Sequence, residues 1–223
     1  MRLQSAIFDM DGTLLDSMPA WRSLLPDILR DAGIVPTPEQ AARIRTLVDR
    51  DMVRYLQTVC GLDRSEEEIR TEMEARMEDF YLHRAKPKPG LVRFLTILKM
   101  EGVWMYVATA TKRSLSVPAL HAAGLDGFFR GLLTSEDAHS HKSESAEIFE
   151  MAMRRLRSNK LNTVVFEDAL YAIRTAKAAG FRVAGVYDAA AEADQDEIRR
   201  ISDYYVRSFE EMVSVDAIET GAK

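Results

Sequence analysis

The chain has 223 residues, a net charge of −5 and a hydrophobic fraction of 47%, as expected of a globular protein with one large or two small domains. An acidic chain has no general attraction for nucleic acid or anionic membranes, so we expect neither as a partner. Cys60 is the one cysteine of the sequence, which excludes an intrachain disulfide and a thiolate zinc cluster.

The first apolar segment, residues 6–8, is followed at once by Asp9. This beginning is too short and too acidic to be a signal peptide. No later apolar run reaches the roughly 18–20 residues that a membrane span needs. With the single cysteine, these features predict a cytoplasmic protein.

Residues 6–8 predict a buried strand that ends in a turn carrying Asp9, Asp11 and Gly12. The two carboxylates would point the same way if the strand continued, and the glycine favours a sharp turn. Two neighbouring acids repel one another unless one is protonated or a cation lies between them. The turn therefore indicates a site of chemistry.

Residues 16–85 contain no convincing strand and predict four helical segments. Residues 37–40 and 65–68 resemble capping boxes, which start helices. Pro26 is expected to kink or end the first helix, and Gly33 to close it. We interpret this stretch as a helical module inserted after the first strand. The alternative is a helical extension with no role at the site.

The rest of the chain alternates short apolar strands with helices. Strands are expected at residues 103–108, 128–133, 163–166, 182–187 and 203–206, and helices at 90–100, 112–123, 143–157, 170–179 and 190–201. This alternation is typical of an α/β fold with a doubly wound parallel sheet covered on both faces. The expected domains are a core of residues 1–15 and 86–223 and a helical domain of residues 16–85.

Ligands bind such sheets beyond the carboxyl ends of the strands. Polar residues follow three of the strands: Asp9 and Asp11 after the first, Thr109 and Thr111 on either side of Ala110 after the second, and Glu167 and Asp168 after the strand at 163–166. Clustered oxygen ligands suit a hard cation such as Mg²⁺. A carboxylate cluster with an attacking aspartate suits phosphoryl transfer, which also needs a fixed cationic side chain.

These residues resemble the signatures of the haloacid dehalogenase (HAD) superfamily. Residues 8–13 (Phe-Asp-Met-Asp-Gly-Thr) are similar to the first signature, and Thr109 to the second. Lys142, ahead of the Ile-Phe pair at 148–149, resembles the third, and residues 165–168 the fourth. The order and spacing match over essentially the whole chain. Residues 166–170 (Phe-Glu-Asp-Ala-Leu), together with residues 178–181 (Ala-Ala-Gly-Phe), are similar to the branch that holds phosphoglycolate-phosphatase-like and β-phosphoglucomutase-like enzymes.

The resemblance implies a role for each of these residues. Asp9 would be the nucleophile, and Asp11 the general acid and then the base. Thr109, with the backbone N–H of Ala110, would hold phosphoryl oxygens, and Lys142 would neutralise the phosphate. Mg²⁺ would be bound by Asp9, by the backbone carbonyl of Asp11 and by Asp168. Glu167 would bind it directly, or lie close by and act through water.

The resemblance also implies a Rossmann-like α/β core with an inserted helical cap. The substrate it implies is a small phosphorylated metabolite. The family lysine is usually flanked by glycine and proline, whereas Lys142 lies between His141 and Ser143. The loop is therefore expected to differ in shape. A helix-capping role is an alternative for Thr109 and for Asp168.

Three functions are compatible with these residues. The first is a Mg²⁺-dependent phosphatase that acts through an aspartyl-phosphate. The second is a β-phosphoglucomutase-like phosphomutase, against which Thr13 speaks, since the mutase usually has an aliphatic residue there. The third is a non-catalytic regulatory binding protein. Substrate specificity is expected from the helical domain, near Trp21, Arg45, Arg50 and Asp51.

Overall fold

The structure, a computed structural model, describes residues 3–44, 47 and 49–214. The chain divides into two compact units. The first combines Met1–Ser17 with Ala85–Lys223, and the second is Met18–Arg84. Among the described residues no helix is long and apolar enough to cross a membrane.

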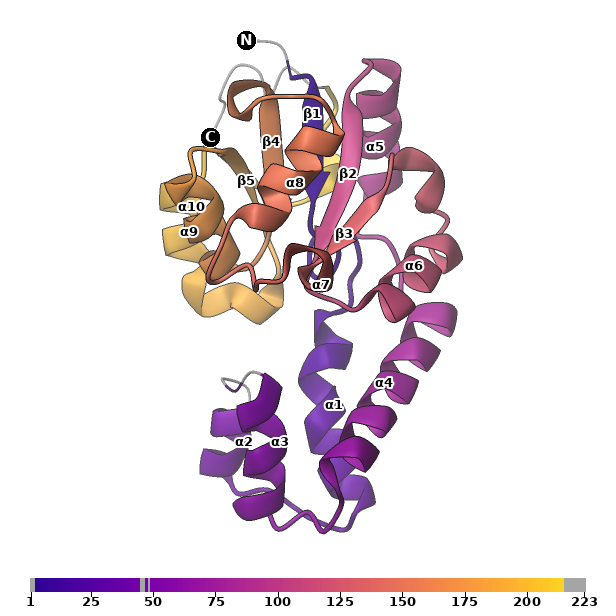
Figure 1. Cartoon of the computed structure of the whole chain (residues 1–223), viewed down its shortest axis with the longest axis vertical. Helices are drawn as coiled ribbons and strands as arrows, with labels where there is room; N and C mark the ends of the chain where they lie inside the picture. The colour runs from indigo at the N-terminus through magenta and orange to yellow at the C-terminus, as the bar shows by residue number, and fades with distance from the viewer. Residues whose placement is uncertain (1–2, 45–46, 48, 215–223) are drawn as a thin grey trace. The chain divides into compact units, whose positions relative to one another are not determined.

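The first unit is built on a parallel sheet (Figure 1). Its strands follow one another in the order β3-β2-β1-β4-β5-β6. They are β1 (Ser5–Phe8), β2 (Trp104–Thr109), β3 (Leu132–Thr134), β4 (Thr163–Glu167), β5 (Arg182–Val186) and β6 (Tyr204–Val206). Every pairing is parallel. The strand order reverses direction at β1, so the predicted doubly wound α/β fold is confirmed.

Alternation along the strands divides the core into two layers. Ile7, Val165 and Val183 point to one face, where they are buried under α8 (Glu147–Arg155) and α9 (Leu170–Ala178). On the other face the rings of Phe8 and Phe166 stack at 4.3 Å between their centroids. Because both faces are apolar and covered, the central strands are continuous hydrophobic runs.

Helices connect the strands of the first unit. They are α5 (Leu91–Met100), α6 (Arg113–Ala122), α7 (Ser135–Ala138), α8, α9 and α10 (Gln195–Ile201). Short 3₁₀ turns complete the connections, at Asp126–Phe128, Lys160–Asn162, Ala189–Asp194 and Phe209–Glu211.

The third strand and two helices depart from the sequence prediction. The apolar residues at 128–133 predict one strand, but Asp126–Phe128 is a 3₁₀ turn and only Leu132–Thr134 pairs with β2. The helix expected from residue 143 begins at Glu147, because a turn that carries Lys142 comes first. The helix expected at 190–201 is split into a 3₁₀ turn and α10.

The second unit is helical, as the sequence predicts. It contains α1 (Met18–Asp31), α2 (Pro38–Ile44), α3 (Asp49–Thr58) and α4 (Glu66–His83). Helix α1 does not end at Pro26, because Ile28 and Leu29 beyond it are fully buried. Burying two such side chains is worth about 1.5–3 kcal/mol each, against a proline cost of roughly 3 kcal/mol.

Gly33 closes α1 as expected. Its φ of 75° is open to glycine, and the Ile34 N–H donates to the Leu29 carbonyl at 2.8 Å. Both predicted capping boxes are present. At α4 the Glu68 N–H donates to the Ser65 hydroxyl, and the Glu68 carboxylate accepts from the Ser65 N–H at 2.7 Å.

Replacing Ser65 is expected to weaken the second unit. Ser65→Ala leaves the Glu68 N–H without its side-chain acceptor, which lowers the free energy of unfolding by about 1 kcal/mol. Urea denaturation followed by circular dichroism measures this change. Glu68→Gln keeps an acceptor for the Ser65 N–H and is the matched control, expected to leave the denaturation midpoint nearly unchanged.

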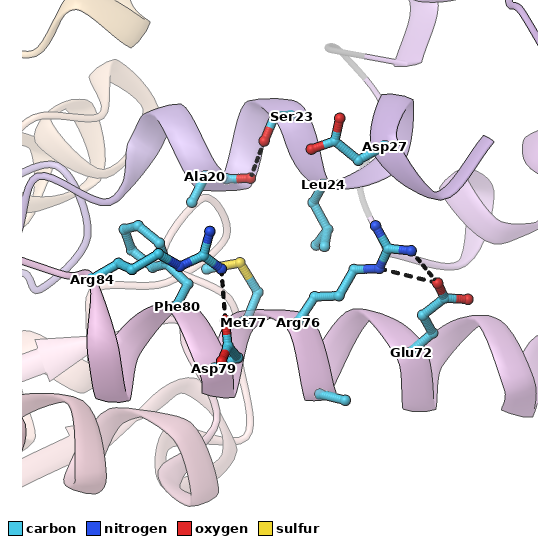
Figure 2. A pocket seen from close by; sticks show the side chains of 11 residues that line it. Ala20, Ser23, Leu24, Asp27, Glu72, Arg76, Met77, Asp79, Phe80 and Arg84 are labelled. Carbon is cyan, nitrogen blue, oxygen red and sulfur yellow. Dashed lines mark hydrogen bonds and ion pairs between the residues drawn. The ribbon is translucent and has the colours of Figure 1, made fainter. Parts of the chain in front are cut away.

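A groove of about 390 Å³ lies between α1 and α4 within the second unit (Figure 2). Leu24, Met77 and Phe80 contribute apolar surface to it. Its arginines are engaged with neighbouring acids: Arg84 bonds Asp79 at 2.8 Å, and Arg76 bonds Asp31 and Glu72. The groove therefore has an apolar floor beside arginines that are already paired with acids.

Candidate active site

Two neighbouring strands end beside one another and bring their acids together. In the register of β1 with β4, Phe8 lies opposite Phe166, and the Asp9 N–H donates to the Phe166 carbonyl at 2.9 Å. Asp9 therefore follows β1 at the level where Glu167 ends β4. The carboxyl ends of parallel strands lie at the same edge of a sheet, so Asp9 and Glu167, which the sequence predicts at strand ends, come together there.

Three carboxylates converge at this edge: Asp9, Glu167 and Asp168. One oxygen from each lies within 4.8 Å of the others, and all three residues are buried. Their exposed fractions are 6%, 1% and 4%. Three buried acids at this spacing repel one another strongly unless positive charge is present.

Lys142 supplies one positive charge from the turn that precedes α8. It is 1% exposed, although the loop lacks the flanking glycine and proline. Its Nζ donates to Asp9 and, at 2.9 Å, to Glu167. The structure therefore places Lys142 within the acid cluster and not on the surface.

The pKa values of Asp9, Asp168 and Lys142 are shifted by burial and by the charges of their neighbours. Burial, and then repulsion from Glu167, raise the pKa of Asp9 to about 8, although the Lys142 ammonium lowers it. The pKa of Asp168 is raised well above its usual range by burial and by Glu167 and Asp9. Burial alone would lower the pKa of Lys142. The carboxylates of Asp9 and Glu167 have the larger combined effect and raise this pKa above its usual range.

The donor set fits a divalent cation. When ionised, the three carboxylates and one ammonium leave an excess of two negative charges among buried groups. Hard oxygen ligands are those that Mg²⁺ prefers. The backbone of the turn packs closely against one of these carboxylates: a Cβ added at Gly12 would stand 2.3 Å from Oδ2 of Asp168. Only glycine at that position lets the turn approach the carboxylate so closely.

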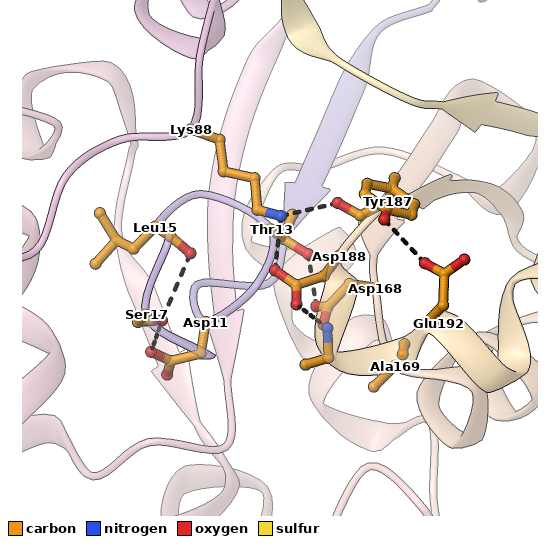
Figure 3. A network of polar contacts seen from close by, with 12 residues as sticks. Asp11, Thr13, Leu15, Ser17, Lys88, Asp168, Ala169, Tyr187, Asp188 and Glu192 are labelled. Atoms are coloured by element: carbon orange, nitrogen blue, oxygen red, sulfur yellow. Dashed lines mark hydrogen bonds and ion pairs between the residues drawn. The ribbon is translucent and has the colours of Figure 1, made fainter. Parts of the chain in front are cut away.

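Asp11 lies apart from the three converging carboxylates. The Ser17 hydroxyl donates to its Oδ1 and the Thr111 hydroxyl to its Oδ2, both at 2.6 Å. Figure 3 shows the Ser17 contact. Glu167 raises the pKa of Asp9 more than Asp11 does. The strand ends at Phe8, so the acids at 9 and 11 do not share a strand face.

Thr109 ends β2, which lies next to β1, and Ala110 follows it. Thr109 is buried, and its hydroxyl accepts from the Thr111 N–H at 3.1 Å. The residue that caps α6 is Lys112, and the one that caps α9 is Ala169. The capping alternatives for Thr109 and Asp168 are therefore wrong.

Thr111 was expected at the second strand end, but its contact with Asp11 and the supporting roles of Thr13 and Ser17 were not predicted from the sequence. The Thr13 hydroxyl donates to Oδ1 of Asp168 at 2.9 Å (Figure 3). Ser17 and Thr111 hold Asp11, as described above. Hydroxyls that follow a strand end by two to nine residues were the available signal, but sequence spacing does not tell which acid each hydroxyl contacts.

The residues expected to set specificity fall in the second unit. The Trp21 Nε1–H donates to the Tyr81 hydroxyl at 3.0 Å, and Asp51 is exposed on α3. Arg45 and the side chain of Arg50 lie outside the described residues.

Comparison with known proteins points to one family. The model described as haloacid dehalogenase-like hydrolase matches residues 6–186. The chain is 24% identical over 185 residues to a phosphorylated carbohydrates phosphatase of Thermotoga maritima, covering 82% of this chain and 85% of that protein. It is 28% identical over 194 residues to phosphoglycolate phosphatase 1 of Pseudomonas aeruginosa, covering 81% and 68%.

The fold has close counterparts among solved structures. CbbY from Rhodobacter sphaeroides, solved in complex with phosphate, superposes with a TM-score of 0.80 at 21% identity. The match covers 97% of this chain and 99% of that one. The resemblance inferred from the four signatures is confirmed by the family model that matches residues 6–186, and the solved structure shows the same fold.

Proposed function

Because this chain belongs to the haloacid dehalogenase-like hydrolase family, we propose that it is a Mg²⁺-dependent phosphatase of a small phosphorylated metabolite. Phosphorylated sugars are the first class of substrate to consider, since a relative is named for phosphorylated carbohydrates. The observation that carries the proposal is the buried cluster of Asp9, Glu167 and Asp168 with Lys142 bonded inside it.

The cation would be held by Asp9, Glu167, Asp168 and the backbone carbonyl of Asp11. When bound, it would neutralise the carboxylates and the charge of the transferring phosphoryl group. Its positive charge would favour the ionised form of Asp9, which is the nucleophile. Lys142 holds the Asp9 carboxylate in place through their hydrogen bond and adds a second positive charge.

The reaction proceeds in two displacements. A carboxylate oxygen of Asp9 bonds to phosphorus while the bond to the leaving oxygen breaks, and Asp11 gives that oxygen its proton. Water then attacks phosphorus, Asp11 takes the water proton, and the bond to Asp9 breaks. The Thr109 hydroxyl and the Ala110 N–H bind the phosphoryl oxygens through both steps.

We assign the second unit, Met18–Arg84, the role of a cap. This helical module is inserted in the chain a few residues after Asp11, and closure of such a module over a phosphoryl site would exclude water and contact the leaving group. Trp21, Arg45, Arg50 and Asp51 are the positions from which it would select the substrate. The protein would work in the cytoplasm, without nucleic acid or membrane as a partner.

A substrate screen tests the proposed activity. Purified protein is incubated with sugar phosphates, phosphoglycolate, nucleotides and phosphorylated cofactors, with Mg²⁺ or with EDTA, and released phosphate is measured. We expect release with Mg²⁺ and loss of it with EDTA. No release across the panel contradicts the proposal, and transfer to a sugar phosphate in place of water indicates a phosphomutase.

The hydroxyl of Thr111 is expected to matter for the proton carrier. Thr111→Val removes the donor to Oδ2 of Asp11, so the carboxyl is less well oriented and kcat falls by about tenfold. KM should change by less than about twofold, because Thr111 is not proposed to bind the phosphoryl group. Thr111→Ser keeps the hydroxyl and is expected to keep most of kcat. Equal losses in both variants would contradict this role.

A further inference from the structure

Lys88 and Asp188 form an ion pair that lies outside the three converging carboxylates. Lys88 Nζ is 2.7 Å from Oδ2 of Asp188 and 2.8 Å from the Tyr187 carbonyl (Figure 3). The side chains are 13% and 5% exposed. Oδ1 of Asp188 accepts from the Ala190 N–H at 2.7 Å, so this carboxylate has well-defined partners on both oxygens.

The pair lies next to Asp168. In the register of β4 with β5, Glu167 lies opposite Gly185, so Asp168 and Asp188 follow adjacent strand ends. Figure 3 shows their side chains close together with Thr13 beside them. The charge of Asp188 also raises the pKa of Asp168. Asp188 therefore acts electrostatically on a carboxylate of the proposed cation site.

Lys88 reaches this place from a segment that the motif signatures do not include. It belongs to the Lys-Pro-Lys-Pro-Gly run at residues 86–90, where the chain re-enters the first unit. Its N–H donates to the Leu14 carbonyl at 2.9 Å, which fixes the backbone beside the turn that carries Asp11. The segment thus delivers a positive charge to the edge of the acid cluster.

We propose that Lys88 and Asp188 are a positioning pair that holds the charge beside Asp168 at zero and thereby sets the cation affinity of the site. This inference rests on the cation site of the proposed function. With both partners present, the pair has no net charge, and the Lys88 ammonium offsets the negative charge that Asp188 places beside Asp168. Removing either partner alone changes the local potential, and the two removals change it in opposite directions.

The signs follow from Coulomb's law. Asp188→Asn leaves the buried Lys88 ammonium uncompensated, and this charge repels a cation at Asp168. Lys88→Met leaves the Asp188 carboxylate, which attracts one. Removing both restores neutrality. If the pair only held the segment against the residues after β5, the two single variants would change the Mg²⁺ affinity in the same direction, because each of them breaks the same ion pair.

Calorimetric titration of Mg²⁺ into the purified full-length protein at one fixed pH tests the inference. Asp188→Asn is expected to raise the Kd about tenfold, within the range found for residues that support metal ligands. Lys88→Met should bind Mg²⁺ at least as tightly as the wild type, and up to about tenfold more tightly. The double variant should return to within about twofold of the wild type.

Lys177→Met is the matched control. Lys177 pairs with Asp203 at 2.7 Å, ahead of β6 and so at the opposite end of the sheet, and its loss should leave the Kd for Mg²⁺ unchanged. If Lys88→Met does not fold, the double variant is compared with Asp188→Asn: a lower Kd for Mg²⁺ in the double variant supports the inference.

Equal weakening by both single variants, or a double variant no better than Asp188→Asn, would overturn the inference. If the wild type itself binds no Mg²⁺, the cation site of the proposed function fails first.

Discussion

Asp9→Asn is expected to reduce phosphate release by about 10⁴-fold or more, the scale seen when a catalytic nucleophile is removed. The amide has nearly the same shape as the carboxylate but cannot form the phosphoryl bond. Its removal also deletes one ligand of the proposed cation site, so the Kd for Mg²⁺ should rise. Steady-state kinetics with the best substrate of the panel, together with calorimetry, measure both effects.

The same substitution is not expected to unfold the protein. Burial and the repulsion from Glu167 raise the pKa of Asp9 to about 8, so its ionised form is unfavourable in the absence of a cation. The neutral amide removes that cost, and the melting temperature of the metal-free variant should equal or exceed that of the wild type. Asp16→Asn makes the same change at an exposed acid and should leave activity intact. Full activity in Asp9→Asn would contradict the role of Asp9.

Lys142→Met is expected to have the second-largest effect, on stability as well as on turnover. It leaves Asp9 and Glu167 buried without their cation, and removing one partner of a buried ion pair costs about 3–5 kcal/mol. Turnover should fall by about 10³-fold, because a fixed charge next to the transferring group is lost. Chemical denaturation and steady-state kinetics measure the two changes.

The response to Mg²⁺ separates this explanation from simple loss of packing. In Lys142→Met the repulsion between the buried carboxylates is no longer offset by the ammonium, and a divalent cation would offset it instead. Mg²⁺ should therefore raise the melting temperature of the variant more than that of the wild type. Lys160→Met removes a partly exposed pair with Glu150 and should cost no more than about 1 kcal/mol. A variant that loses stability but responds to Mg²⁺ like the wild type would contradict the role of Lys142 in the cluster.

The strand ends could be predicted from the sequence because they depend on local patterns. Apolar runs that stop at a carboxylate, as at Asp9 and at Glu167, mark both the strand and the place where it ends. Parallel topology then brings those ends together without further information. The capping boxes of the second unit are local in the same way, since four consecutive residues specify them.

Contacts between distant residues could not be predicted in this way. The sequence indicated that Asp9 and Asp11 crowd one another, yet Glu167 raises the pKa of Asp9 more. That result depends on the register of β1 with β4, which no local pattern specifies. The same holds for the bond from Thr13 to Asp168, across 155 positions of sequence.

The predicted helix boundaries were wrong for a different reason. Periodicity at 143–157 continues through residues that tertiary contacts hold in a turn, because Lys142 is drawn into the acid cluster. The preference for helix is overridden there by the buried ion pairs. The helix that continues through Pro26 is the converse case, in which buried side chains outweigh a local cost.

The two connections to the second unit run side by side. Leu15 and Pro87 form an antiparallel bridge, and the Asp16 N–H donates to the Lys86 carbonyl at 3.0 Å. For the sheet, the 67 residues of Met18–Arg84 are therefore equivalent to the loop of a hairpin whose stem is closed. Insertions at such closed stems leave the surrounding backbone pairing intact. Modules of other length or selectivity could occupy this position while Asp9, Asp11 and Lys88 keep their places, so the chemistry and the choice of substrate can vary separately.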